Sequence, residues 1–170
     1  MGEKRSNQNI EVIAASFLEK DKLKTFLDFN SFLSNNKLRK GKTGRTGVGS
    51  WTISCNNKKI GHFNFRENLW SIDFFDLFSR NEWFEKCEKQ LTPELKDFVL
   101  SNINTTSSCC VKETCHSVEN KEILGVVFNS RVCACRPIVL VNPDGKALAY
   151  AKELVLIGKN IIAEMYGTFE

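Results

Sequence analysis

Three stretches of alternating apolar and polar residues lie between positions 51 and 76, which read WTISCNNKKIGHFNFRENLWSIDFFD. In the first stretch, Trp51, Ile53 and Cys55 alternate with polar residues, and the other two stretches show the same period of two. This period is typical of strands that bury one face and expose the other to water. Turn-forming residues at 56–58 and 66–68 separate the stretches. The segment therefore predicts a three-stranded antiparallel meander.

Helical spacing marks most of the chain on either side of the meander. Apolar residues recur at intervals of three and four over 9–20, 21–34, 81–90 and 92–103, and again after Asp144. The first two segments form either two helices or one bent helix. Two further strands are expected at 122–128 and 132–141, with Pro137 restricting the second to an edge or a bulge. We expect an α+β fold, in which an antiparallel sheet of about five strands, the meander plus a hairpin, packs with helices and ends in a long C-terminal helix.

The chain has 170 residues, a formal net charge of +4 and 42% hydrophobic residues, which is an ordinary globular composition. This length suits one domain, so we expect a single α+β domain at 9–170 after a disordered tail at 1–8. Apolar runs stay short of the roughly 18 residues that a membrane helix needs. The polar N-terminus lacks the apolar centre of a secretory signal. The expected location is therefore the cytoplasm, with no membrane partner.

Seven cysteines are unevenly distributed, with five of them between positions 109 and 135. An odd number without a secretory signal argues against a disulfide framework. Thiolates hold Zn²⁺ in tetrahedral sites, and residues two apart on a strand point to the same face. We therefore expect a structural zinc site whose ligands come from Cys109, Cys110, Cys115, Cys133 and Cys135. The alternatives are buried, inert thiols, or a redox sensor or cysteine enzyme in which Cys115 is the first candidate.

Basic and glycine residues dominate positions 37–49. Four glycines within nine residues cannot sustain a helix, so we interpret 35–50 as a basic loop. The pattern differs from a phosphate-binding P-loop, because position 36 is asparagine where that motif requires glycine. One interpretation is a solvated connection between helix and sheet. The other is phosphate or nucleic-acid binding through Lys40, Lys42 and Arg45.

Aromatic residues are enriched, with 13 Phe and 3 Trp, and many of them lie in or near the meander. Core packing is the simpler explanation. A sheet face walled by Trp51, Phe63, Phe65, Trp70 and Phe74 would alternatively form a pocket for a small molecule. Known catalytic motifs are missing, no residue is assigned a catalytic role, and His62 is expected to be an ordinary sheet residue. We therefore expect a binding protein in place of an enzyme.

The order of these signals resembles a set of small, uncharacterised bacterial proteins over roughly two thirds of the chain. The shared features are a tryptophan-led hairpin at 51–54, an Asn-rich turn at 102–104, a cysteine loop, an Ile-Leu-Gly-x-x-Phe strand at 123–128, a Val-Cys pair at 132–133 and an Asn-Pro-Asp helix start at 142–144. The resemblance implies a bacterial cytosolic protein with a shared cysteine arrangement. This chain departs from it in the adjacent Cys109 and Cys110 and in the extra Cys135.

The leading functional hypothesis is a non-enzymatic, thiol-rich binding domain. It would hold a structural zinc ion and bind a small molecule on the aromatic face of its sheet. Nucleic-acid or phosphate binding by the basic loop at 37–49, and cysteine-based redox chemistry, are the alternatives.

Overall fold

The computed structural model describes residues 9–42, 49–74, 81–105, 121–130, 132–133 and 137–167. The expected tail at 1–8 and nearly all of the cysteine loop at 104–120 lie outside these residues. Along the described chain the elements are α1 (Ile10–Phe17), α2 (Lys20–Asn35), β1 (Arg39–Lys42), β2 (Ser50–Cys55), β3 (Lys58–Arg66), β4 (Leu69–Asp73), α4 (Asn81–Glu88), α5 (Pro93–Ser101), β5 (Lys121–Ile123), β6 (Val126–Phe128), β7 (Val139–Val141) and α6 (Gly145–Tyr166).

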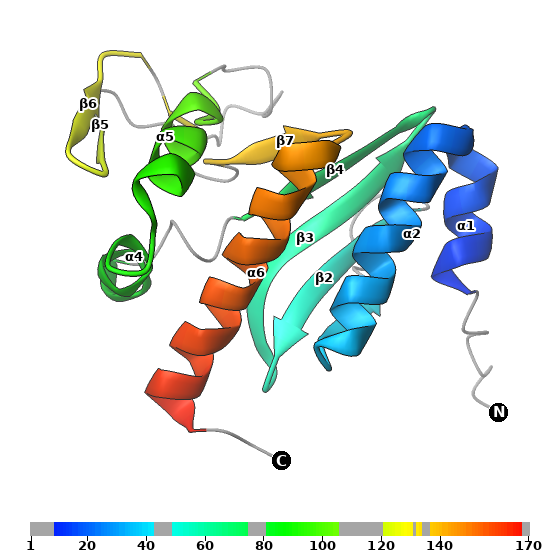
Figure 1. Cartoon of the computed structure of the whole chain (residues 1–170), viewed down its shortest axis with the longest axis horizontal. Coiled ribbons are helices and arrows are strands. Elements are labelled where there is room, and N and C mark those ends of the chain that lie inside the picture. The colour runs from blue at the N-terminus through cyan, green and yellow to red at the C-terminus, as the bar shows by residue number, and fades with distance from the viewer. Residues whose placement is uncertain are drawn as a thin grey trace, which may run out of the picture.

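Five of the strands form one antiparallel sheet in the order β1-β2-β3-β4-β7. Its centre is the predicted meander, in which Trp51 lies opposite Phe63 and Phe63 opposite Ile72. Helices α1, α2 and α6 form a layer over one face of this sheet, in front of the strands in Figure 1. We call this the helix face, and the opposite one the distal face. The predicted α+β fold with its five-stranded antiparallel sheet and long C-terminal helix is therefore confirmed.

Local capping explains where two of the helices begin. The Asn9 side chain accepts a hydrogen bond of 3.0 Å from the backbone N–H of Glu11 at the start of α1. Thr92 accepts one of 3.2 Å from the backbone N–H of Leu95 at the start of α5, where Pro93 is the first helical residue. Both caps satisfy N–H groups that a helix start leaves without a partner. The helix predicted over 92–103 is therefore confirmed, with Thr92 as its N-cap.

The core between helices and sheet is largely aromatic. Phe26 of α2 is fully buried, and its ring centre lies 4.6 Å from that of Phe65 and 5.5 Å from that of Trp70. Phe63 stacks on Trp51 at 5.5 Å with an angle of 10° between the ring planes. The alternation in the meander therefore places its large aromatic side chains on the helix face, where α2 covers them.

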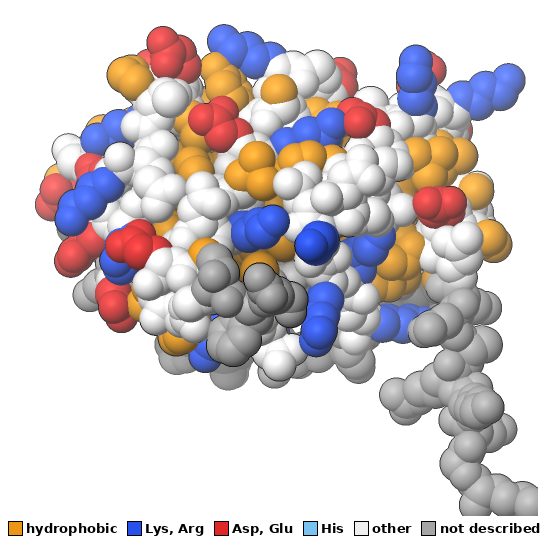
Figure 2. Space-filling view, turned by 60° about the horizontal axis from the view of Figure 1, so that its bottom comes forward, with side chains coloured by type: hydrophobic (Ala, Val, Ile, Leu, Met, Phe, Trp, Pro, Cys, Tyr) orange, Lys and Arg blue, Asp and Glu red, His pale blue; other side chains and the backbone are white. Residues whose placement is uncertain are grey.

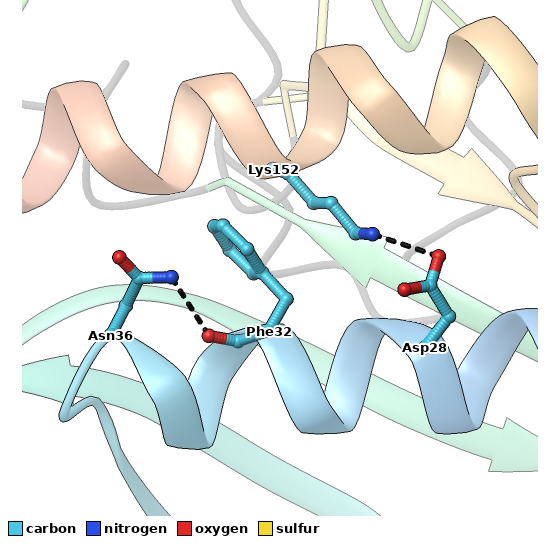
Figure 3. Close-up of polar contacts among 4 residues, drawn as sticks. All are labelled: Asp28, Phe32, Asn36 and Lys152. Atoms are coloured by element: carbon cyan, nitrogen blue, oxygen red, sulfur yellow. Dashed lines mark hydrogen bonds and ion pairs between the residues drawn. The ribbon is translucent and has the colours of Figure 1, made fainter.

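Helix α6 lies beside α2 on the helix face and holds it in place (Figure 3). Lys152 of α6 forms an ion pair of 2.8 Å with Asp28, and its ammonium lies 5.6 Å from the ring centre of Phe32. Near the end of α2, the Asn36 side chain donates a hydrogen bond of 2.9 Å to the carbonyl oxygen of Phe32. Lys159 of α6 donates one of 3.0 Å to the carbonyl oxygen of Asn36. These contacts fix the end of α2, from which the chain enters β1.

Three local predictions need correction. The segment 35–50 was expected to be a loop, but 39–42 is a strand of the main sheet. The stretch 122–128 was expected to be one strand, whereas it is the tight hairpin β5–β6, with Leu124 and Gly125 both at positive φ in the turn. Among the described residues of the strand expected at 132–141, only 139–141 form a strand paired with β4. The hairpin forms its own two-stranded sheet, so β1 and β7 complete the main sheet instead.

Candidate functional site: a basic edge of the sheet

The end strand β1 is the most strongly charged element of the main sheet. Positions 37–42 read KLRKGK and carry four positive charges and no acidic residue, which equals the net excess of the whole chain. The strand pairs with β2 on one side. Within the described ranges its outer side pairs with no strand, because β1 is last in the strand order. An edge strand of this kind presents backbone N–H and C=O groups to the surroundings.

A specific helix ending aims the chain into β1. Lys37 adopts a left-handed conformation with φ of 57°. Its backbone N–H donates to the carbonyl oxygen of Ser34 at 3.0 Å, and that of Leu38 donates to the carbonyl oxygen of Leu33 at 2.9 Å. These two bonds and the burial of Leu33 and Leu38 define a Schellman ending, which usually has glycine at the left-handed position. The Schellman ending of α2 therefore fixes where strand β1 begins.

The register of β1 divides its four residues between the two faces of the sheet. Lys40 lies opposite Ile53 and Lys42 opposite Trp51, both of which are buried on the helix face. Arg39 and Gly41 lie opposite Ser54 and Thr52, on the distal face. Arg39, Gly41 and Lys42 are exposed, and Lys40 is half-buried. The edge therefore presents one exposed cation on each face, Arg39 on the distal face and Lys42 on the helix face.

Lys40 is already engaged within the protein. Its ammonium donates hydrogen bonds of 2.9 Å to the side-chain oxygen of Asn30 and 2.8 Å to the hydroxyl of Ser34, both on α2. The Asn30 amide in turn donates one of 3.0 Å to the carboxylate of Glu11 on α1. Burial lowers the pKa of Lys40 from its ordinary value, and the charge of Glu11 opposes this shift. This network ties the edge strand to both N-terminal helices.

The surroundings of the edge are also basic. The end of the molecule where α2 finishes comes forward in Figure 2, and blue Lys and Arg side chains gather in the lower middle of that view with few red ones among them. Exposed Lys59 on β3 adds a cation across from Ser54 on the distal face. Arg39 reaches the turn between β2 and β3, where its guanidinium donates a hydrogen bond of 3.2 Å to Asn57. An anionic partner would therefore meet a favourable potential along this edge.

The prediction of a zinc-holding, thiol-rich binding domain is wrong for the part of the chain that the structure describes. No group of three or more His, Cys, Asp or Glu side chains there could hold a metal ion. The proposed ligands Cys109, Cys110, Cys115 and Cys135 lie outside the described residues. Cys133, the fifth, is 1% exposed, forms no disulfide, and lies beside Val132 in the interior.

The five aromatic residues proposed to line a pocket are packed in the core. Their exposed fractions run from 0 to 4%, for Trp51, Phe63, Phe65, Trp70 and Phe74. Two surface hollows of about 430 and 570 Å³ lie at α2, and none of the five residues lines either hollow. The aromatic side chains therefore stabilise the layer contact and leave no open wall for a ligand.

The residues predicted to bind phosphate are only partly brought together. Lys40 and Lys42 lie on the helix-face side of β1, and Arg45 lies outside the described residues. Arg39 and Gly41 of the same edge were not selected from the sequence. The available signal was the pair Leu33 and Leu38, because a Schellman ending places two such apolar residues in contact and directs the chain into a new element.

The distal face carries small polar side chains in place of aromatic ones. Thr52, His62 and Asp73 lie opposite one another on β2, β3 and β4. The hydroxyl oxygen of Thr52 lies 3.4 Å from Nδ1 of His62, and Asn64 donates a hydrogen bond of 3.3 Å to the Asp73 carboxylate. His62 is thus a sheet residue within a polar row, as expected.

The burial of Cys87 on α4 can be tested through the pH dependence of the protein's stability. The thiol is fully buried, and burial, with a smaller contribution from the charge of Glu88, raises its pKa from 9.0 to about 12. Above pH 9 the unfolded chain loses this proton while the folded chain keeps it, so stability falls as pH rises towards 12. We expect wild-type protein to lose about 2 kcal/mol more than Cys87→Ala between pH 8 and pH 10.5. Urea denaturation at the two pH values measures this difference, and parallel losses in both proteins would contradict it.

Each described helix is too short or too polar to cross a membrane. Comparison with protein-family models, curated proteins and solved structures finds no match to this chain. The resemblance to small bacterial proteins therefore stays a prediction.

Proposed function

We propose that this protein is a peptide-binding module that captures an extended, acidic segment of a partner protein as an added strand on β1. The observation that carries the proposal is the position of β1, an edge strand with three cations, preceded by Lys37, and with an outer side that pairs with no strand among the described residues. Addition of a strand to a sheet edge is a recurrent mode of peptide recognition, in which backbone hydrogen bonds provide affinity and side chains provide selectivity.

Charge supports an acidic partner over a second copy of the chain. Pairing of two β1 strands would bring Lys and Arg side chains against one another, and like charges directly opposite are destabilising. Lysine on a short edge strand is a common protection against pairing between identical sheets. The same Lys and Arg side chains would attract an acidic strand. The positive charge of β1 therefore disfavours pairing with a second copy and favours an acidic partner.

The conformation of the edge supports a preformed site. The Schellman ending fixes the start of β1, and the network from Lys40 through Asn30 to Glu11 holds the strand against α1 and α2. A partner strand would therefore pair with backbone that is already extended, and it would carry most of the ordering cost itself. Cys55, Cys87 and Cys133 form no disulfide, which suits a cytoplasmic partner.

The test uses a fluorescent eight-residue peptide in which Glu-Thr-Thr-Glu is repeated twice, so that acidic residues three positions apart can face both Arg39 and Lys42. We expect it to bind the full chain in a fluorescence anisotropy titration at low salt, and an analogue with every amide N-methylated to bind at least tenfold more weakly. The analogue keeps the charges but lacks the N–H donors that strand addition needs. Equal affinity of the two peptides, or the absence of binding by both, would overturn the proposal.

Charge reversal at the edge tests the location of the site. Arg39→Glu combined with Lys42→Glu is expected to weaken binding by about tenfold or more, because two favourable contacts become repulsive. The matched control combines Lys20→Glu with Lys89→Glu, which changes the net charge equally at exposed positions on the start of α2 and after α4. Equal weakening in both double variants would show nonspecific electrostatic attraction and contradict a site on β1.

A further inference from the structure

The four residues of β1 would make different contacts with a partner strand. These differences favour a particular sequence in the partner. Arg39 and Lys42 are exposed cations three positions apart. They lie on opposite faces of the sheet, with Arg39 across from Ser54 and Lys42 across from Trp51. An extended partner alternates its side chains between faces in the same way. Two acidic residues three positions apart in the partner would therefore each face one of these cations.

No acidic residue is expected opposite Lys40 in the partner. Its ammonium already has two acceptors on α2, the Asn30 side-chain oxygen at 2.9 Å and the Ser34 hydroxyl at 2.8 Å. Glu11 contributes a negative charge to this network through Asn30. A partner carboxylate at this position would have to displace hydrogen bonds that exist, so the position opposite Lys40 tolerates many residues.

Gly41 leaves an open space beside the edge. A Cβ atom built on it would meet no atom within 4 Å, whereas one built on Gly61 in the same sheet would meet the carbonyl oxygen of Asp73 at 2.5 Å. Across the strand pair, Thr52 is half-buried on the same face. An aromatic side chain opposite a strand glycine covers the exposed backbone and gains contact area. The position opposite Gly41 therefore favours Phe, Tyr or Trp.

We infer that the preferred partner contains, from its N- to its C-terminus, an acidic residue, an aromatic residue, any residue and a second acidic residue, paired antiparallel to β1. The first acid would lie opposite Lys42, the aromatic residue opposite Gly41 and the last acid opposite Arg39. Antiparallel pairing continues the pattern of every other strand pair in the main sheet and is slightly the more stable per residue. This inference rests on the proposed function and adds the recognition sequence to it.

The test compares three peptides of identical composition, with threonine on both sides of the core. The cores are Glu-Phe-Thr-Glu, its reversal Glu-Thr-Phe-Glu, and the clustered Glu-Glu-Phe-Thr. We expect the first to bind the full chain about tenfold more tightly than the other two in anisotropy titrations. Equal binding by all three, with the N-methylated analogue inactive, would overturn the recognition sequence and leave strand addition intact. Tightest binding by the reversed core would overturn antiparallel pairing, and no binding by any would overturn the proposed function as well.

A charge exchange tests the register directly. Arg39→Glu is expected to weaken binding of the Glu-Phe-Thr-Glu peptide and to favour a Glu-Phe-Thr-Lys peptide over it, because the last position would then face a carboxylate. In wild-type protein the order of the two peptides should be the opposite. Arg39 is exposed, so the variant keeps the fold, which circular dichroism checks. The same preference order in both proteins would contradict the placement of the last acid opposite Arg39.

Discussion

Replacing Phe26 with alanine is expected to lower the free energy of unfolding by about 3–5 kcal/mol. The side chain is fully buried on α2, and its ring contacts those of Phe63, Phe65 and Trp70 at centre distances of 5.6, 4.6 and 5.5 Å. Alanine would remove these contacts and leave a cavity between the helix layer and the sheet. The paired strands below can relax into it only in part, so most of the loss remains. Urea denaturation followed by tryptophan fluorescence measures the change.

Phe17→Ala provides the matched control. Phe17 is half-buried at the end of α1, and its ring stacks on that of Phe65 at a centre distance of 6.3 Å. We expect a loss below about 2 kcal/mol, because water already reaches part of the side chain and the vacated space opens to solvent. A loss as large as that of Phe26→Ala would contradict the placement of Phe26 at the centre of the core.

The meander and the last helix could be predicted because their periodicity is strong and local. In the meander the inward positions between Trp51 and Ile72 are large and apolar except at Gly61, so only one register buries them all. Strand β1 could not be predicted in this way, because Arg-Lys-Gly-Lys has no apolar alternation. It is a strand because it pairs with the edge of β2. The helix end before it was also hard to recognise, because Lys37 occupies the left-handed position where glycine is usual.

The hairpin β5–β6 shows the opposite difficulty. Its sequence from Ile123 to Phe128 is nearly continuous in apolar residues and therefore resembles one buried strand. The turn depends on Leu124 at φ of 53° and Gly125 at 77°, the conformation of a tight hairpin turn. Asparagine or aspartate usually precedes the glycine in such turns. Because leucine stands there in this chain, the sequence does not indicate a turn.

The candidate site was recognised from its charges but not from its geometry. The sequence places Lys40 and Lys42 in one basic segment, but the function of each depends on which residue of β2 it faces. That pairing sets Lys40 against α2, where Asn30 and Ser34 accept its hydrogen bonds, and leaves Arg39 exposed on the distal face. The sequence does not show this division, because the pairing register of β1 is a property of the assembled sheet.

Gly61→Ala is expected to destabilise the protein by about 2–3 kcal/mol. Gly61 is buried on β3 opposite Ile53, beside the irregularity in register at Ile53 and Ser54. A Cβ atom there would lie 2.5 Å from the carbonyl oxygen of Asp73, which is backbone of the neighbouring strand and cannot rotate away. The methyl group would therefore push β3 and β4 apart where they pair, next to the polar row of the distal face.

The matched control is Gly41→Ala in the edge strand of the same sheet. A Cβ atom at Gly41 meets nothing within 4 Å, and φ at this residue is not positive. We therefore expect a change within about 0.5 kcal/mol of zero, since the added methyl group also restricts the unfolded chain. Urea denaturation of the two variants separates close strand contact from a general intolerance of alanine. A Gly61→Ala protein that is much less stable than Gly41→Ala is the expected result, whereas equal stability of the two would contradict the close approach of β3 to β4 at Gly61.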